Sequence, residues 1–161
     1  MREFDLLGVQ LADFQGRIFE SSLLLNISTP IFLRRFKNSK VANEIDNLKG
    51  VTWTLDELEA IQNINEEFSD ANYGNNKYDK DVLYWIGYIL RYISYTRNIS
   101  TKKLFSFISC EKLNSMYYAY HTQGEEYVAE SIFEIFNINE SIFDSNNKFK
   151  EQIRKQILAN I

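Results

Sequence analysis

Apolar residues recur along the chain at the spacing of an α-helix, and the first run shows the pattern clearly. It consists of Phe4, Leu7, Leu11, Phe14, Ile18 and Leu25. Because residues three, four and seven apart share one face of a helix, this run predicts a helix over about residues 3–26. Gly8 and Gly16 each weaken such a helix by about 1 kcal/mol relative to alanine, so we expect them to allow close packing against another helix.

The most apolar segment spans residues 78–97, and its pattern predicts a long helix. Its large apolar residues cover more than one face: Val82, Leu83, Trp85, Ile86, Ile89, Leu90 and Ile93. A helix with this distribution is typically central and surrounded by others. Aromatic and β-branched residues are also frequent in strands, but about 20 residues without a break favour a helix. Gly87 is expected to mark a close helix crossing.

Residues that cap helix N-termini delimit the shorter elements. Ser28, Ser39 and Ser100 precede predicted short helices over 31–37, 40–46 and 101–108, with Pro30 suited to a first turn. Thr54 with Glu57, and Thr122 with Glu125, have the capping-box spacing and predict helices that run to Phe68 and Asn137. A helix near 110–120 and a final amphipathic helix with Phe149, Ile153 and Ile157 complete the prediction.

These elements together predict an all-α fold. We expect a compact single-domain bundle, residues 1–161, of about seven to nine helices, several of them short, around the apolar helix at 78–97. The chain has 161 residues, of which 45% are hydrophobic, and this composition supports a core without disulfides.

Cysteine and histidine counts remove several classes of function. One Cys excludes a disulfide framework and a cysteine-based zinc finger, and one His excludes a histidine-rich metal site. Acidic residues near the N-terminus interrupt any signal-peptide core, and the apolar run at 82–93 is too short to span a bilayer. We therefore expect a cytoplasmic protein with no membrane segment and no cofactor.

The net charge of −4 conceals two purely acidic segments. Residues 54–72 and 125–144 contain no lysine or arginine but carry many of the acidic residues of the chain. One interpretation is that these are two solvated helix faces, with acids placed at N-terminal turns for the helix dipole. The other is that they form a docking surface for a basic partner.

Candidate catalytic residues are few, and the sequence favours a protein that is not an enzyme. Cys110 and His121 lie too far apart along one helix to touch. The Arg–His motif of HEPN-type ribonucleases is absent, because the nearest arginine before His121 is Arg97. Metal-ligating and phosphate-binding motifs are also absent from the sequence.

A helix-turn-helix over residues 100–122 is the alternative hypothesis. Two short helices would flank residues 107–110, and the segment offers four candidate nucleic-acid contacts: Lys102, Lys103, Lys112 and Asn114. Recognition helices usually carry more cations than this one, so DNA binding is the second choice.

Arg91 is the most suggestive single residue. It stands in the apolar helix among tyrosines at helical spacing, Tyr84, Tyr88 and Tyr95. A guanidinium group in such a place must be paired or must reach the surface. It could form an internal bridge to Asp13 or Glu20, or it could be an anchor for a partner, since Tyr, Trp and Arg dominate such sites.

Four stretches of the sequence resemble a family of short uncharacterised Firmicutes proteins. They are DLLGVQLADFQGRIFE (5–20), FLRRFKNSKVA (32–42), YDKDVLYWIGYILRYISYTR (78–97) and YAYHTQ (118–123). Genes of this family often neighbour small toxin-like genes, including presumed ADP-ribosyltransferase-like toxins. The resemblance implies an antitoxin-like or accessory role in a toxin–antitoxin module, and it carries over no catalytic residue.

The leading hypothesis is therefore a protein-binding, antitoxin-like or accessory protein that occludes the surface of a partner, and the expected partner is a toxin encoded nearby. The alternative is a DNA-binding transcriptional regulator. The expected partner contacts are Glu57, Glu66, Glu67, Tyr73, Tyr88, Arg91, Glu126, Glu130 and Glu134.

Overall fold

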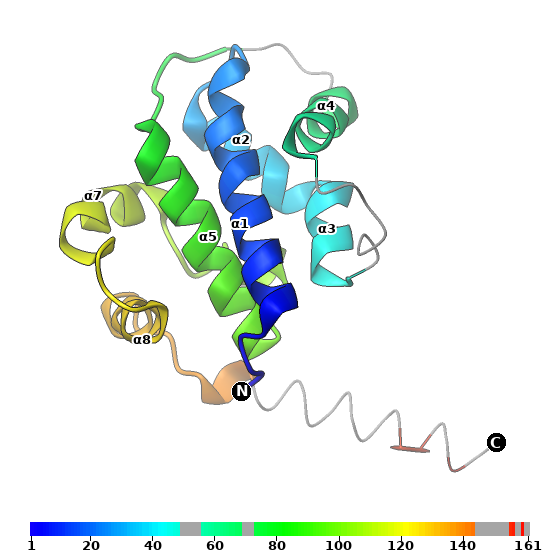
Figure 1. Cartoon of the computed structure of the whole chain (residues 1–161), viewed down its shortest axis with the longest axis vertical. Coiled ribbons are helices and arrows are strands. Elements are labelled where there is room, and N and C mark those ends of the chain that lie inside the picture. The colour runs from blue at the N-terminus through cyan, green and yellow to red at the C-terminus, as the bar shows by residue number, and fades with distance from the viewer. Residues whose placement is uncertain (49–55, 69–72, 144–154, 157–158, 160–161) are drawn as a thin grey trace.

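Helix α5 (Lys80–Arg97) runs through the centre of the molecule in a computed structural model of the chain (Figure 1). The structure describes residues 1–48, 56–68, 73–143, 155–156 and 159. Asp81 in the first turn of α5 and Arg97 in its last turn complement the helix dipole. Asn98 ends the helix in the left-handed conformation, with φ 52°. The central helix predicted at 78–97 is thus confirmed.

Within the described residues all regular structure is helical, which confirms the predicted all-α class. The other α-helices are α1 (Leu6–Ser21), α2 (Thr29–Asn38), α3 (Lys40–Asp46), α4 (Glu57–Glu67), α6 (Thr101–Leu104), α7 (Cys110–Tyr120) and α8 (Glu125–Ile135). A 3-10 turn, η1 (Ser22–Leu24), follows α1 directly. No helix in this part of the chain combines the length and apolarity needed to cross a membrane.

Helices α1 and α5 cross at glycines, as the sequence predicts. A Cβ atom added to Gly87 would lie 2.7 Å from the carbonyl oxygen of Gln15 and 3.0 Å from Cα of Gly16. The side-chain amide of Gln15 donates a 2.9 Å hydrogen bond to the Gly87 carbonyl oxygen. The backbones of α1 and α5 are therefore in contact at this crossing. A residue with a Cβ atom at position 87 would not leave room for that contact.

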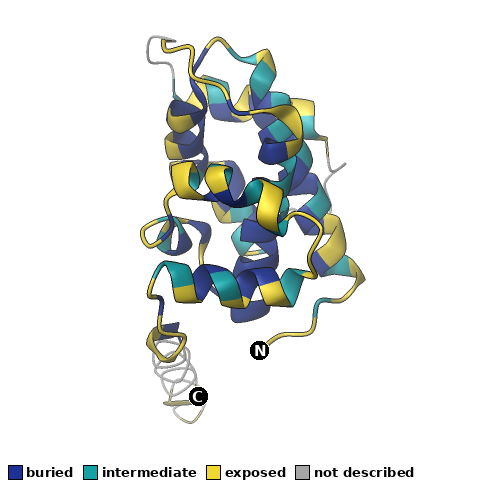
Figure 2. Ribbon diagram, turned by 90° about the vertical axis from the view of Figure 1, so that its left-hand side faces the viewer, coloured by how far each residue is buried: buried dark blue, intermediate teal, exposed yellow. Residues whose placement is uncertain are grey.

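The remaining helices cover both sides of this central pair. Helices α3 and α4 lie on one side of α1 and α5, and α7 and α8 lie on the other (Figure 1). Viewed from the side of α7 and α8, exposed and buried residues alternate along each helix, as expected for amphipathic helices around one core (Figure 2). In that core the ring of Phe19 packs edge-on against Phe32 and Phe36, which joins α1 to α2.

Two predicted helices, over about 3–26 and over 101–108, are shorter in the structure. Helix α1 ends at Ser21, where the 3-10 turn η1 follows, and not near residue 26. Helix α1 begins at Leu6 and not near residue 3, because the Asp5 carboxylate accepts a 3.0 Å hydrogen bond from the Gly8 amide. The helix predicted over 101–108 ends at Leu104, and Ser106 and Phe107 form tight turn bonds to Lys103 and Leu104.

Both predicted capping boxes were wrong. Helix α4 begins after Asp56, whose carboxylate accepts from the amides of Leu58 and Glu59, while Thr54 lies outside the described residues. Helix α8 begins after Gly124, so Glu125 is its first residue. The predicted helix around Phe149, Ile153 and Ile157 lies outside the described residues, as do 69–72 of the predicted loop.

Candidate functional site

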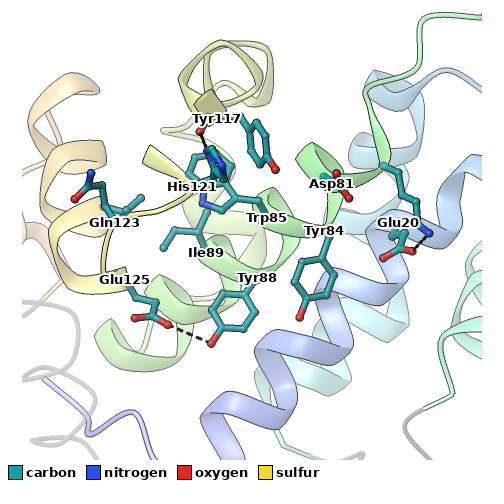
Figure 3. Close-up of a pocket in the computed structure, with 12 residues that line it drawn as sticks. Glu20, Asp81, Tyr84, Trp85, Tyr88, Ile89, Tyr117, His121, Gln123 and Glu125 are labelled. Carbon is teal, nitrogen blue, oxygen red and sulfur yellow. Dashed lines mark hydrogen bonds and ion pairs between the residues drawn. The ribbon is translucent and has the colours of Figure 1, made fainter. Parts of the chain in front are cut away.

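A cleft of about 580 Å³ lies where α5 meets α7 and α8 (Figure 3). Helix α5 contributes its floor, the α7–α8 hairpin one wall, and the end of α1 a single acidic residue. The cleft is lined by Glu20, Lys80, Asp81, Tyr84, Trp85, Tyr88, Ile89, Tyr117, His121, Gln123, Glu125 and Val128. Its volume is in the range of ordinary ligand sites, and its lining combines aromatic rings with carboxylates.

Aromatic rings form the apolar part of the cleft. The Trp85 and Tyr117 rings meet edge to face with centroids 5.8 Å apart. The imidazole of His121 stacks on Tyr117 at 4.4 Å, and its Nδ1 lies 2.9 Å from the Tyr117 carbonyl oxygen. A carbonyl oxygen can only accept, so this contact is a hydrogen bond in the tautomer that carries its proton on Nδ1. Because the two residues are four positions apart, His121 lies against Tyr117, which is one helical turn earlier in the chain.

Tyrosine hydroxyl groups on the α5 face donate to carboxylates from other helices. Tyr88 donates to Glu125 at 3.3 Å, and Tyr84 donates to Asp13 at 2.6 Å. Burial, followed by the charge of Glu125, raises the pKa of Tyr88 to about 12. Burial and Asp13 likewise raise the pKa of Tyr84. Both hydroxyl groups therefore stay protonated at neutral pH and act as donors.

The charges in the cleft are unbalanced. Lys80 forms a 3.0 Å ion pair with Glu20 at one end. Asp81, in the exposed first turn of α5, and Glu125, at the start of α8, add two further carboxylates. A cleft with three carboxylates, one ammonium group and several ring faces attracts a cation.

The same tyrosine series anchors α8 and the N-terminus farther along α5. Tyr92 donates to Glu126, and Tyr95 donates to Asp5, each at 2.6 Å. Glu126 also receives both terminal nitrogens of Arg97, at 2.6 and 2.9 Å. The hydrogen bond from Arg97, supported by Tyr92, lowers the pKa of Glu126. Glu126 therefore ties α8 to α5, and both of its carboxylate oxygens accept hydrogen bonds from α5.

Among the expected partner contacts, those on α4 lie away from the cleft. Glu57 pairs with Arg17 of α1, Glu66 accepts from Gln62, and Glu67 accepts from the Lys40 amide. Because α4 and α8 lie on opposite sides of the α1–α5 pair, the acidic residues on these two helices do not form one surface (Figure 1).

The other expected contacts are also dispersed. Tyr73 is exposed, and its hydroxyl lies 3.4 Å from the Arg34 guanidinium, near α2. Glu130 and Glu134 are exposed on α8 beside a separate depression that includes Glu140. Only Tyr88 of the expected contacts lines the aromatic cleft.

Arg91 is buried, with 2% of its surface exposed, so it is not available as an anchor for a partner. The expected internal bridge exists, but its partner is neither Asp13 nor Glu20. The guanidinium group pairs with Asp46 of α3 at 2.8 Å and also donates to Gln15 and Thr101. Burial lowers the pKa of Arg91, and the charge of Asp46 opposes that shift. This network joins four segments of the fold.

The residues proposed for nucleic-acid binding are divided between two short helices. Lys102 is exposed and Asn114 is half-buried. The ammonium groups of Lys103 and Lys112 lie over the rings of Phe143 and Phe136, at 5.5 and 5.1 Å. Two of the three lysines therefore pack against the segment after α8, and no observation favours DNA binding.

Cys110 and His121 occupy opposite ends of α7, about 16 Å apart at 1.5 Å per residue. Burial raises the pKa of the Cys110 thiol to about 12, which keeps it un-ionised at neutral pH. Among the described residues, no three His, Cys, Asp or Glu side chains gather in a way that could hold a metal ion.

Sequence reasoning missed most of the cleft. The pattern of residues 78–97 places Trp85 among the apolar residues of a surrounded helix, and the capping-box spacing predicts a capping role for Glu125. The spacing of Trp85 and Tyr88, and of Tyr117 and His121, places each pair on one helix face and could have suggested an aromatic surface. Only the packing of α7 and α8 on α5 brings these two faces together.

A comparison with protein-family models, curated proteins and solved structures found no match to this chain. The resemblance to the Firmicutes family therefore stays a prediction from the sequence.

Proposed function

We propose that this protein binds a protein partner and controls it by covering its active surface, as an antitoxin-like or accessory protein. The observation that supports this role is the cleft in which Trp85, Tyr88 and Tyr117 lie beside Asp81 and Glu125. Trp and Tyr are the residue types that most often contribute large binding energies in protein interfaces.

The surface beside the cleft supports protein binding as well. Tyr118, which follows the cleft residue Tyr117 in the chain, is 78% exposed. Tyr127, which precedes the cleft residue Val128, is 58% exposed. Tyrosine is enriched in recognition surfaces because it combines a large rigid ring with a hydroxyl group. The ring of Tyr118 packs against the cleft residue Tyr117, with centroids 5.4 Å apart, so exposed tyrosine surface adjoins the cleft.

We place this binding in the cytoplasm. The single cysteine, Cys110, is free and half-buried, and its thiol is compatible with a reducing compartment. A partner with a basic active surface would be attracted by the acidic cleft, and its substrate would then be excluded by steric overlap.

Co-expression with the product of the adjacent gene tests the proposal. We expect the two proteins to co-elute as one complex in size-exclusion chromatography, and we expect this chain to restore growth if its neighbour is toxic. The variant Trp85→Ala, Tyr117→Ala should lose the complex, whereas Tyr73→Ala, which removes an exposed tyrosine away from the cleft, should keep it. Absence of both the complex and the growth rescue would overturn the proposal.

A further inference from the structure

The geometry points to an arginine side chain, presented by a basic segment of the partner, as the group that enters the cleft between α5 and the α7–α8 hairpin. This inference rests on the proposed function and gives the chemistry of its partner. Arginine is planar, permanently charged and able to stack on rings while it bonds to carboxylates.

An arginine that stacks on a tyrosine ring beside a carboxylate already occurs within the protein, at another position of α5. The guanidinium group of Arg2 lies 3.9 Å above the ring of Tyr95, and the Tyr95 hydroxyl donates to the Asp5 carboxylate. A guanidinium group, a tyrosine ring and a carboxylate thus form one set at the C-terminal end of α5. Such stacking over an aromatic face is favourable within about 6 Å.

The cleft repeats two of these three parts about two helical turns earlier on α5. Tyr88 presents its ring beside Tyr84, with centroids 6.1 Å apart, and its hydroxyl donates to Glu125. Asp81 supplies a second carboxylate among the residues that line the cleft. The part that the cleft lacks is the cation, because the Lys80 ammonium group is paired with Glu20.

The structure favours a guanidinium group over an ammonium group. Aromatic rings that line the cleft, such as Tyr88 and Trp85, suit a flat group, and a carboxylate such as Glu125 can accept two parallel hydrogen bonds from arginine. Lysine presents a compact, strongly hydrated charge that loses more hydration on entering.

A segment of a protein chain fits better than a free small cation. The cleft volume of about 580 Å³ exceeds one arginine side chain, which leaves room for flanking residues. The exposed Tyr118, whose ring contacts the cleft residue Tyr117, also offers a contact that a small cation could not use.

Peptide titration tests this inference directly. Three blocked pentapeptides, Gly-Gly-Arg-Gly-Gly and the same peptide with lysine or citrulline, would be titrated into the full chain by calorimetry at low salt. We expect the arginine peptide to bind at least about tenfold more tightly than the citrulline peptide and more tightly than the lysine peptide. Equal binding of arginine and citrulline, or no binding of arginine up to about 10 mM, would overturn the inference.

A charge-matched pair of variants locates the site. Asp81→Asn with Glu125→Gln removes two charges from the cleft, and the new amide oxygen at 125 can still accept from Tyr88. Glu130→Gln with Glu134→Gln removes two charges from exposed positions on α8 outside the cleft. We expect at least about a tenfold loss of arginine-peptide affinity in the first variant and less than about a twofold loss in the second. Equal losses would overturn the inference, as would free agmatine binding as tightly as the peptide.

The outcomes separate this inference from the proposed function. If the adjacent gene product forms a complex that the cleft variant leaves intact, the proposed function stands and the arginine site is overturned. If the arginine peptide binds as expected but no complex or growth rescue is found, the proposed function alone is overturned.

Discussion

At the scale of single residues, polar side chains connect the helices at defined points of the packing. Tyrosines on α5 donate to carboxylates of α1 and α8, and Arg91 joins α5 to Asp46, Gln15 and Thr101. Hydrogen bonds to charged groups are about twice as strong as neutral ones, and they depend on direction. These contacts therefore fix the relative placement of helices that apolar contacts alone would leave adjustable.

Replacing Arg91 with alanine should destabilise the fold strongly. Asp46 has only 12% of its side chain exposed, so the variant would leave a nearly buried charge without its cation. We expect a loss of about 3–5 kcal/mol in the free energy of unfolding, measured by urea denaturation. Arg34→Ala, at an exposed position, should cost less than about 1 kcal/mol. Similar losses in the two variants would contradict this role for Arg91.

Glu126 should make stability depend on pH in acid. The hydrogen bond from Arg97 lowers the pKa of Glu126 below the ordinary value of 4.5. The folded form therefore binds this proton more weakly than the unfolded form, and the stabilisation is present above pH 4.5 and lost as pH falls through the folded pKa. The difference in Tm between the wild type and Glu126→Gln should be largest at neutral pH and should shrink in acid. A difference that stays constant with pH would contradict this linkage.

At the scale of secondary-structure elements, glycines allow the backbones of α1 and α5 to come into contact where the two helices cross. Gly87 and Gly16 lie at the contact, and the Gln15 amide bridges the two backbones. The glycines lower helix propensity, but they allow two helices to pack with their backbones in contact. Their position was predictable because glycine within an apolar helical pattern needs a packing reason.

Gly87→Ala should therefore destabilise the protein although alanine is the better helix former. Its Cβ would lie 2.7 Å from a backbone oxygen, which cannot rotate away as a side chain can. We expect a net cost of about 1–3 kcal/mol by denaturant unfolding, since overpacking exceeds the gain in propensity. Gly124→Ala is the control, because nothing lies within 4 Å of its added Cβ, and it should change stability by less than about 1 kcal/mol. A Gly87→Ala variant that is more stable than the wild type would contradict this prediction, since it would mean that α1 and α5 can move apart to accept the Cβ atom.

At the scale of the whole molecule, the described parts of the two acidic segments lie on opposite sides. Helix α4 carries the first, and α8 carries part of the second, with α1 and α5 between them (Figure 1). Charges separated by more than about 10 Å in physiological salt act almost independently at the surface. One partner surface can therefore engage the cleft side without contact to α4.

This arrangement predicts that α4 does not contribute to partner binding. The triple variant Glu59→Gln, Glu66→Gln, Glu67→Gln should bind the adjacent gene product within about twofold of the wild type, measured by surface plasmon resonance. The cleft variant Asp81→Asn, Glu125→Gln should bind at least about tenfold more weakly. A large loss in the α4 variant would mean that the partner reaches both sides of the bundle.

The sequence by itself determined the all-α class, the central helix and the close crossing at its glycines. Each follows from spacing along a single helix, because a period of three to four residues defines a face whatever packs on it. The burial of Arg91 was predictable for the same reason, since its neighbours are apolar.

Only the tertiary structure decided which faces meet. The partner of Arg91 is Asp46 on α3, and the Tyr88 hydroxyl meets Glu125 at the start of α8, contacts that join residues 45 and 37 positions apart. No local pattern encodes such a pairing, because it depends on how helices cross and how loops return the chain. For the same reason, only the fold places the acidic residues of α4 and α8 on opposite sides of the molecule (Figure 1). It also lets aromatic residues with a core-like pattern line a cleft.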